Sequence, residues 1–204
     1  MSKPNAYTER DFPLHSKESA PEASVEAMNW YEQNFGMVPN LAQVLAESPA
    51  LLNAYWQSQV AISGHSALTP AETNIVQTTV AHANECQYCV AGHTAFGKTE
   101  FFNNTDEELA AIREGKPFEN PKHEALRDFT LRVARNQGRM STNQLNEFLG
   151  AGYSKAAALD VVANVAVKVM SNYANQIVLT PLDDAFAALS EGLPYKEERT
   201  AKAA

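Results

Sequence analysis

The chain has 204 residues, of which 45% are hydrophobic and 20% are charged, which is the balance of a globular protein long enough to bury a core. Acidic residues number 24 and basic residues 16, and the formal charge of −8 excludes a cationic surface for nucleic acid or anionic lipid. No apolar run reaches the about 20 residues of a membrane span, and the N-terminal segment has no apolar signal-peptide centre. We therefore expect a cytoplasmic protein with neither nucleic acid nor membrane as a partner.

Capping signals and apolar periodicity predict an all-α fold. Polar residues followed by proline, or by glutamate or glutamine three residues later, open several segments, because they satisfy free amides at a helix start. Glycines such as Gly36, Gly64 and Gly115 follow periodic stretches as C-caps. The predicted helices are, in chain order, 21–35, 40–46, 49–63, 70–84, 87–98, 106–114, 121–136, 142–150, 154–178 and 181–189, and no segment has the alternation of a strand.

Composition separates the two ends of the chain from its middle. Residues 1–18 are polar and contain two prolines, so we expect an extended N-terminal arm. Residues 191–204 form a charged C-terminal tail. Residues 19–190 contain no linker and are expected to form one helical domain.

The chemically informative segment contains the only two cysteines, Cys86 and Cys89, followed by His93. At about 100° per residue, a helix places these three side chains within about 60° of arc. His93 lies four residues after Cys89 and can stabilise its thiolate, and a helix that starts near Gln87 also lowers thiol pKa values at its N-terminus. Two thiols one turn apart can also form a disulfide. The pattern favours dithiol redox chemistry.

Two other interpretations of this segment compete with a redox pair. His82, Cys86, Cys89 and His93 resemble four zinc ligands, but the two histidines would be about 16 Å apart along a continuous helix, too far for one tetrahedral site. Alternatively, both cysteines are inert core residues, as free cysteines often are. We favour redox chemistry and expect neither metal nor cofactor.

The segment resembles the carboxymuconolactone decarboxylase and alkylhydroperoxidase AhpD-like family, and its peroxidase-related branch in particular. The motif carrying this likeness is Cys86-x-x-Cys89-x-x-x-His93, downstream of a helix that starts after Thr69. Further similarity lies in segments 35–41, 47–52, 151–154 and 171–175, so that the resemblance covers about residues 19–186. It implies an all-helical fold, homo-oligomers such as trimers or hexamers, and metal-free thiol-dependent peroxidase chemistry.

The resemblance also implies roles for individual residues. Cys89 matches the cysteine that attacks peroxide, and Cys86 matches the partner that forms the disulfide and meets the reductant. His93 matches the relay histidine, and Tyr88 occupies a variable position before the second cysteine.

One position departs from the family pattern. The relay glutamate of the family lies twelve residues before the first motif cysteine, and here Asn74 stands there. An asparagine cannot take up and release a proton at neutral pH. Glu85 is a candidate replacement, although a solvated glutamate at a helix end is the simpler interpretation, and His82 could line the same pocket or be an ordinary half-buried histidine.

The function expected from these observations is antioxidant: a thiol peroxidase that uses a Cys86/Cys89 cycle, an external dithiol reductant and a peroxide substrate. The alternatives are a decarboxylase acting on a small lactone acid, and a redox-sensing helical module without turnover. Other residues carry less functional weight. His65 and His123 are expected at the surface, and the aromatic residues Trp30, Tyr31, Tyr55 and Trp56 are expected in the core or at a subunit contact.

Overall fold

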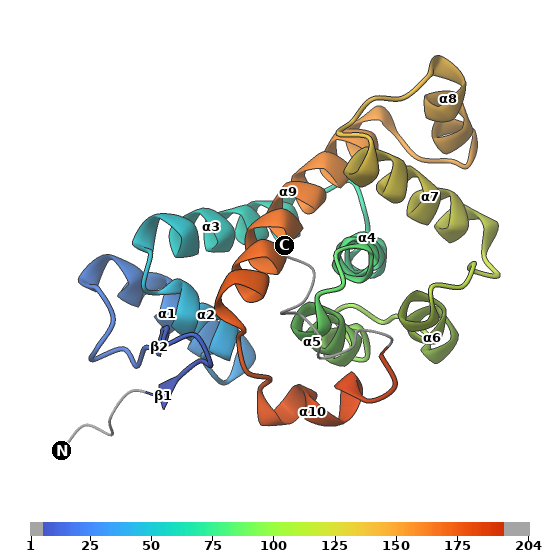
Figure 1. Ribbon diagram of the computed structural model, residues 1–204. Helices are drawn as coiled ribbons and strands as arrows, with labels where there is room; N and C mark the ends of the chain where they lie inside the picture. Colours follow the sequence, from blue (N-terminus) through green and yellow to red (C-terminus); the bar gives the residue numbers. More distant parts are fainter. Residues whose placement is uncertain (1–5, 194–204) are drawn as a thin grey trace, which may run out of the picture.

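A computed structural model describes residues 6–193, which form ten helices and one short β-hairpin (Figure 1). The elements are β1 (Ala6–Tyr7), β2 (Pro13–Leu14), α1 (Glu22–Phe35), α2 (Asn40–Leu45), α3 (Pro49–His65), α4 (Pro70–Ala83), α5 (Gln87–Gly97), α6 (Asp106–Glu114), α7 (Pro121–Arg135), α8 (Thr142–Gly150), α9 (Lys155–Val178) and α10 (Asp184–Ser190). The all-α prediction is confirmed, and each helix boundary lies within three residues of its predicted position.

Side-chain caps account for the accuracy of the helix starts. Thr69, Thr105 and Ser141 each accept from the backbone amide three residues later, and the Glu or Gln there reaches back to the cap amide. Such an N-cap contributes about 1 kcal/mol to helix stability. The caps therefore fix where α4, α6 and α8 begin.

Two local predictions are wrong. Gly64 does not end its helix, because α3 continues to His65 and Ser66 is the C-cap residue. The expectation that no strand occurs fails for the antiparallel pair of β1 and β2, in which Ala6 lies opposite Leu14. A turn between Thr8 and Phe12 closes this pair through a backbone hydrogen bond of 2.9 Å.

The hairpin also changes the description of the N-terminal arm. Leu14 packs with Val44 of α2 and Val178 of α9, and the Arg10 guanidinium donates to the carbonyl of Ile177 at 2.9 Å. The described part of the arm is therefore anchored to the helices. Residues 1–5 and 194–204, which include most of the predicted charged tail, lie outside the described residues.

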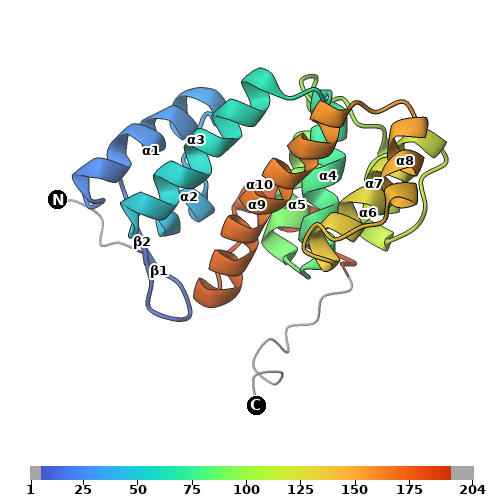
Figure 2. The same ribbon diagram turned by 90° about the horizontal axis from the view of Figure 1, so that it is seen from above.

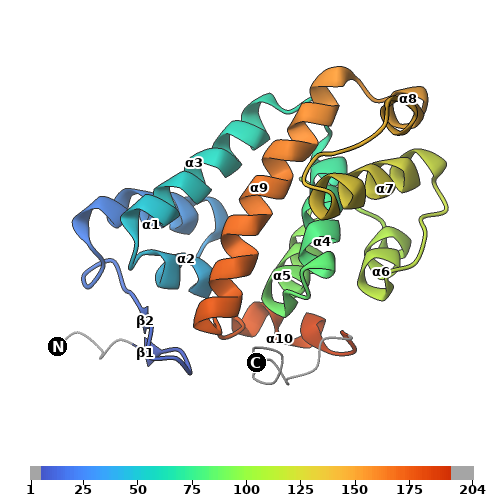
Figure 3. The same cartoon turned by 45° about the horizontal axis from the view of Figure 1, so that its top comes forward.

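The long helix α9 lies in the middle of the fold. In Figures 2 and 3 it passes between α3 on one side and α4 and α5 on the other. One apolar cluster joins α1, α2, α3, α4, α5, α9 and α10, and contains both cysteines. A second cluster joins α4, α6, α7, α8 and α9. Helix α9 contributes to both, so a residue at its centre faces the middle of the molecule.

The lengths and compositions of the helices bear on whether any of them could span a membrane. Within residues 6–193 no helix combines the length and the hydropathy needed to cross a bilayer.

The tight approach of α5 to α4 and α6 can be tested at Gly97. A Cβ atom there would lie 2.6 Å from Leu109 Cδ2 and 2.7 Å from Asn74 Nδ2. We expect Gly97→Ala to lower the free energy of unfolding by about 1–3 kcal/mol, measured by urea denaturation.

Gly64→Ala is the matched control for that variant. It adds the same methyl group to a helix, at a position where no atom lies within 4 Å apart from its chain neighbours and its own helix backbone. It should raise stability by up to about 1 kcal/mol. Equal effects of the two substitutions would contradict the close packing of Gly97.

Candidate active site

A sharp break between α4 and α5 sets the direction of both cysteines. The amide of Cys86 reaches back to donate to the carbonyl of Ala81 at 2.9 Å. Glu85 adopts a left-handed conformation with φ of 54°, which costs a non-glycine residue about 1–2 kcal/mol. Cys86 is then the N-cap residue of α5, and Cys89 lies in its first turn, where unpaired amides favour negative charge.

Both thiols are free and buried beneath α9. Cys86 is 1% exposed and Cys89 is 3% exposed. The side-chain amide of Asn175 donates to both sulfurs, at 3.2 Å to Cys89 Sγ and 3.6 Å to Cys86 Sγ. The hydroxyl of Ser171, one turn earlier, lies 3.9 Å from Cys89 Sγ. Helix α9 therefore supplies donors that stabilise negative charge on the Cys89 sulfur.

His93 lies one turn after Cys89 and is held between two buried side chains. Its Nδ1 is 2.9 Å from Oδ1 of Asn74 on α4, and its Nε2 is 2.9 Å from Nζ of Lys168 on α9. Asn74 is 0% exposed and Lys168 is 1% exposed. The position that the family resemblance marks for a carboxylate is thus in direct contact with the histidine, and a buried lysine is present on its other side.

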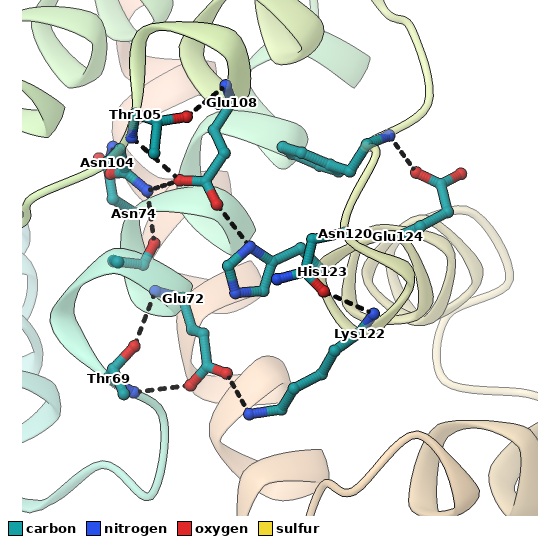
Figure 4. A network of polar contacts seen from close by, with 12 residues as sticks. Thr69, Glu72, Asn74, Asn104, Thr105, Glu108, Asn120, Lys122, His123 and Glu124 are labelled. Carbon is teal, nitrogen blue, oxygen red and sulfur yellow. Dashed lines mark hydrogen bonds and ion pairs between the residues drawn. The ribbon is translucent and has the colours of Figure 1, made fainter.

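Asn74 begins a hydrogen-bond chain that runs through α6 to α7, as Figure 4 shows. Its Nδ2 donates to Oδ1 of Asn104 at 2.8 Å, and Nδ2 of Asn104 donates to Glu108 Oε2 at 3.1 Å. The other oxygen of Glu108 lies 2.6 Å from Nδ1 of His123. The prediction that His123 lies on the surface is wrong, because this contact leaves its side chain only 16% exposed.

The chain has a fixed direction, which assigns the proton on His93. The carboxylate of Glu108 can only accept, so Asn104 directs its amide nitrogen there and its oxygen toward Asn74. Asn74 then donates with its nitrogen and presents its oxygen to His93. Nδ1 of His93 therefore carries the proton, and Nε2 accepts from the Lys168 ammonium. His93 is a neutral imidazole in this network.

The two thiols differ in acidity. Burial by itself raises the pKa of Cys89, but the hydrogen bond from Cys86 and the positive charge of Lys168, joined by donors on α9, lower that pKa to about 5. The hydrogen bond with Cys89 and burial raise the pKa of Cys86 well above its usual value. At neutral pH, Cys89 is therefore a thiolate and Cys86 a thiol.

Burial and neighbouring charges also set the pKa values of His93 and Lys168. Burial and the neighbouring Lys168 hold the pKa of His93 well below its usual value. Burial acts to lower the pKa of Lys168, but the negative charge of Cys89 outweighs it and raises that pKa. The site thus contains one thiolate, one ammonium and a neutral imidazole.

Cys89, His93 and Lys168 border a cavity of about 560 Å³. Most of its wall is apolar and aromatic, with contributions from α1, α3, α5 and α10 that include Tyr31, Phe35, Tyr55, Phe96 and Phe186. Tyr31 and Tyr55 belong to the apolar cluster around the cysteines, as expected of core residues, and Trp30 and Trp56 pack beside that cluster. Trp30, Tyr31 and Tyr55 also line the cavity. An organic molecule with an apolar body fits such a cavity.

Tyr88 links the motif to two other helices. Its hydroxyl donates to the carboxylate of Asp183, just before α10, and accepts from the amide of Leu41 in α2 at 3.1 Å. Burial, together with the charge of Asp183, raises the pKa of Tyr88 well above its usual value. Tyr88 therefore holds α2 and α10 against α5 at one end of the cavity.

Two other candidate residues lie apart from the sulfurs. The side chain of Glu85 is exposed, which agrees with a solvated glutamate at a helix end. The His82 ring faces Gly115 and the backbone of Arg113 after α6, and burial lowers its pKa. The structure therefore brings Cys86, Cys89, His93 and Asn74 together, but it does not bring Glu85 or His82 to them.

The residues that the sequence analysis did not assign to the site are the polar ones of α9. Asn164, Lys168, Ser171 and Asn175 recur every three or four residues and are all buried. This spacing marks one polar stripe within an apolar helix. The stripe is the signal that could have identified Lys168.

Within the described part of the chain, the acidic and sulfur groups do not gather into a metal site. Among residues 6–193, no three His, Cys, Asp or Glu side chains are arranged to hold a metal ion. The helix break at Cys86 also turns His82 toward α6, away from the cysteines.

The acidity of Cys89 predicts a specific pH dependence for alkylation. Since its pKa is lowered to about 5, iodoacetamide should modify Cys89 with a midpoint near that pH. In a Cys89→Ser variant Cys86 loses its hydrogen bond with the Cys89 sulfur, but burial still raises the pKa of Cys86, so this thiol should react at a higher pH than Cys89. Peptide mass spectrometry measures both rates, and an ordinary thiol midpoint for Cys89 would contradict the assignment.

A comparison with known protein families matches one segment of the chain. Residues 46–115 match the carboxymuconolactone decarboxylase family. No curated protein sequence matches the chain at a significant level.

Several solved structures share the fold. The alkylhydroperoxidase AhpD core protein from Ralstonia eutropha JMP134, an uncharacterized peroxidase-related protein, superposes with a TM-score of 0.76 and 21% identity over 86% of this chain and 93% of that one. A peroxidase-related protein from Silicibacter sp. TM1040 gives 0.73 and 18% over 91% and 97%. The debrominase Bmp8, as a cysteine-to-alanine variant with 2,3,4-tribromopyrrole, gives 0.68 and 19% over 91% and 97%.

The family match spans α3 to α6 and includes Cys86, Cys89, His93 and Asn74. The structural neighbours extend the likeness in fold to most of the chain. The segment that carries both cysteines thus matches the carboxymuconolactone decarboxylase family, and the chain shares the fold of the AhpD-like structures.

Proposed function

We propose that the protein is a thiol-dependent peroxidase that reduces organic hydroperoxides through a Cys86/Cys89 dithiol cycle. The observation that carries this proposal is the unequal pair of thiols. Cys89, with a pKa of about 5, borders the cavity, while Cys86 stays protonated one helical turn away. A nucleophile and a resolving thiol need these two states.

The first step uses the thiolate. Cys89 attacks the terminal oxygen of the hydroperoxide, so an S–O bond forms while the O–O bond breaks. The products are a sulfenic acid on Cys89 and an alkoxide, which leaves as the alcohol after it gains a proton.

The second step uses the remaining thiol. Cys86 attacks the sulfenic sulfur of Cys89, and its proton leaves with the hydroxyl group as water. The intramolecular disulfide is then reduced by an external dithiol, which returns both cysteines to the starting state. The cycle needs neither metal nor cofactor, and it suits the reducing cytoplasm, which we propose as its compartment.

The cavity supports organic over inorganic peroxide. Its volume of about 560 Å³ is far larger than hydrogen peroxide requires, and its aromatic wall suits an apolar molecule better than a small polar one. Apolar walls reward the burial of apolar substrate surface by about 25 cal/mol per Å². The substrate class we propose is a hydroperoxide with an aromatic or branched apolar body.

A second candidate is reductive removal of halogen from an aromatic ring. The structural neighbour Bmp8 is a debrominase crystallised with a brominated pyrrole, and the aromatic wall beside Cys89 suits a flat halogenated ring. The Cys89 thiolate and the Cys86 thiol would supply two electrons and a proton and become a disulfide, while a carbon–hydrogen bond replaces the carbon–halogen bond and the halogen leaves as halide.

We further propose that the protein assembles through α9. Leu159, Val162, Tyr173 and Ile177 recur along its outer face and are between 48% and 72% exposed. Large apolar side chains aligned on one helix face are typical of subunit contacts. The occupant we propose is a second copy of the chain, in a trimer or hexamer as the family resemblance implies.

Assembly can be tested in solution. Light scattering should give a mass several times the 22.3 kDa of the monomer. Val162→Glu should lower that mass, because it introduces a charge into the contact. Val60→Glu is the control, since Val60 on α3 is 40% exposed but lies outside the α9 face. A monomer at micromolar concentration would contradict the proposal.

Catalysis predicts a mass change and a substrate preference. One equivalent of cumene hydroperoxide should lower the subunit mass by about 2 Da through loss of two thiol hydrogens. With excess dithiol, consumption should be continuous and faster than with hydrogen peroxide. Cys89→Ser should abolish it, and Cys86→Ser should allow a sulfenic acid to be trapped on Cys89.

The outcomes separate the alternatives. One stoichiometric oxidation without further turnover would indicate a redox sensor. Release of bromide from a bromopyrrole without peroxide consumption would favour the halogen reaction, and carbon dioxide release from a lactone acid would favour a decarboxylase. Disulfide-linked dimers as the main product would contradict the intramolecular cycle.

A further inference from the structure

Lys168, at the centre of α9, is a buried charged residue that has no role in the dithiol cycle described above. Lys168 is 1% exposed, and its ammonium donates to His93 Nε2 at 2.9 Å. No carboxylate of residues 6–193 forms an ion pair with it. A buried ammonium without a negative partner is unstable by several kcal/mol. The negative charge must come from another group.

The elements packed around Lys168 leave one source for that charge. Helix α5 presents Cys86, Cys89 and His93, and α3 presents the hydroxyl of Tyr55. Helix α4 contributes the neutral amide of Asn74 behind His93. Tyrosine hydroxyls and imidazoles do not carry negative charge at neutral pH. A cysteine thiolate is the remaining counter-charge.

Access decides between the two thiols. Cys89 and Lys168 both border the 560 Å³ cavity, whereas Cys86 is not part of its wall. The Asn175 amide also lies closer to Cys89 Sγ, at 3.2 Å, than to Cys86 Sγ, at 3.6 Å. The ammonium and the thiolate therefore face the same space as the substrate.

From this geometry we infer that Lys168 is a catalytic residue: it is the counter-ion of the Cys89 thiolate and the acid that protonates the leaving alkoxide. Asn74 makes this possible because it holds His93 neutral, with its Nε2 lone pair on Lys168. The positive charge that a carboxylate–histidine pair would place on the imidazole resides on α9 instead.

The proton balance follows from that assignment. The thiolate attacks the hydroperoxide and forms the S–O bond, and the alkoxide takes a proton from the ammonium, which becomes a neutral amine. The Cys86 thiol then forms the disulfide, and its own proton leaves in water. The external dithiol returns two electrons and two protons, one to Cys86 and one, through Cys89, to Lys168. The inference uses the proposed peroxidase only for the identity of the leaving group.

Variants of Lys168 test the counter-ion without any substrate. Lys168→Met removes the charge and the donor, whereas Lys168→Gln removes the charge but keeps a donor. Both should raise the midpoint of Cys89 alkylation by about 1–3 pH units, as loss of a nearby opposite charge does. Lys155→Met, an exposed lysine at the start of the same helix, should leave the midpoint unchanged.

A measurement on the unmodified protein tests whether Lys168 gives up its proton during the reaction. The ¹³Cε shift of Lys168, assigned through its contact with His93, should report an ammonium in the reduced protein and an amine in the disulfide form at pH 8. Burial without a counter-charge lowers the pKa of a lysine, so we expect the Lys168 ammonium to lose its proton once the thiolate is consumed. This measurement does not depend on whether a variant folds.

The results also separate this inference from the proposed function. An unchanged alkylation midpoint in folded Lys168→Gln, or an ammonium in both redox states, would overturn the role of Lys168 while leaving peroxide reduction intact. Shifted midpoints in a protein that consumes no hydroperoxide would support the Lys168–Cys89 pair and reject the peroxidase. Loss of turnover in Lys168→Gln, with the fold verified by circular dichroism, is the expected combined result.

Discussion

The burial of one positive charge at the centre of α9 governs the arrangement of the site. An ammonium removed from water must have hydrogen-bond acceptors and a counter-charge. His93 supplies the acceptor and Cys89 the negative charge, and both lie on α5, whose first turn passes beneath α9. The break between α4 and α5 and the left-handed Glu85 are what bring α5 to that place. The packing of α5 against α9 therefore also determines the charge states of Cys89, His93 and Lys168.

Asn74, although neutral, helps to set the charges of the site, because its amide keeps His93 neutral beside the Lys168 ammonium. A carboxylate there would favour an imidazolium, and a second cation next to Lys168 would be repelled. The amide instead fixes the direction of each hydrogen bond from Glu108 to His93. The amide of Asn74 on α4 and the buried ammonium of Lys168 on α9 are thus consistent with each other.

Much of this could be predicted from the sequence, for physical reasons that differ between regions. Helix starts at Thr69, Thr105 and Ser141 depend on contacts three residues apart, so local sequence determines them. The same holds for Cys86, Cys89 and His93, which share one short segment. Lys168 could not be placed in this way, because its partner His93 is 75 residues away in the chain. The use of the core residues Tyr31 and Tyr55 as cavity walls likewise depends on how α1 and α3 pack against α5.

That separation in sequence has a consequence for biosynthesis. Synthesis from the N-terminus produces Cys86 and Cys89 well before α9, which spans Lys155–Val178. Until α9 packs on α5, neither Lys168 nor Asn175 is near the sulfurs, and Cys89 has the acidity of an ordinary thiol. A nascent chain is therefore protonated at both cysteines and slow to react with oxidants. The reactive thiolate forms only when the molecule is complete, so folding itself protects the cysteines from premature oxidation.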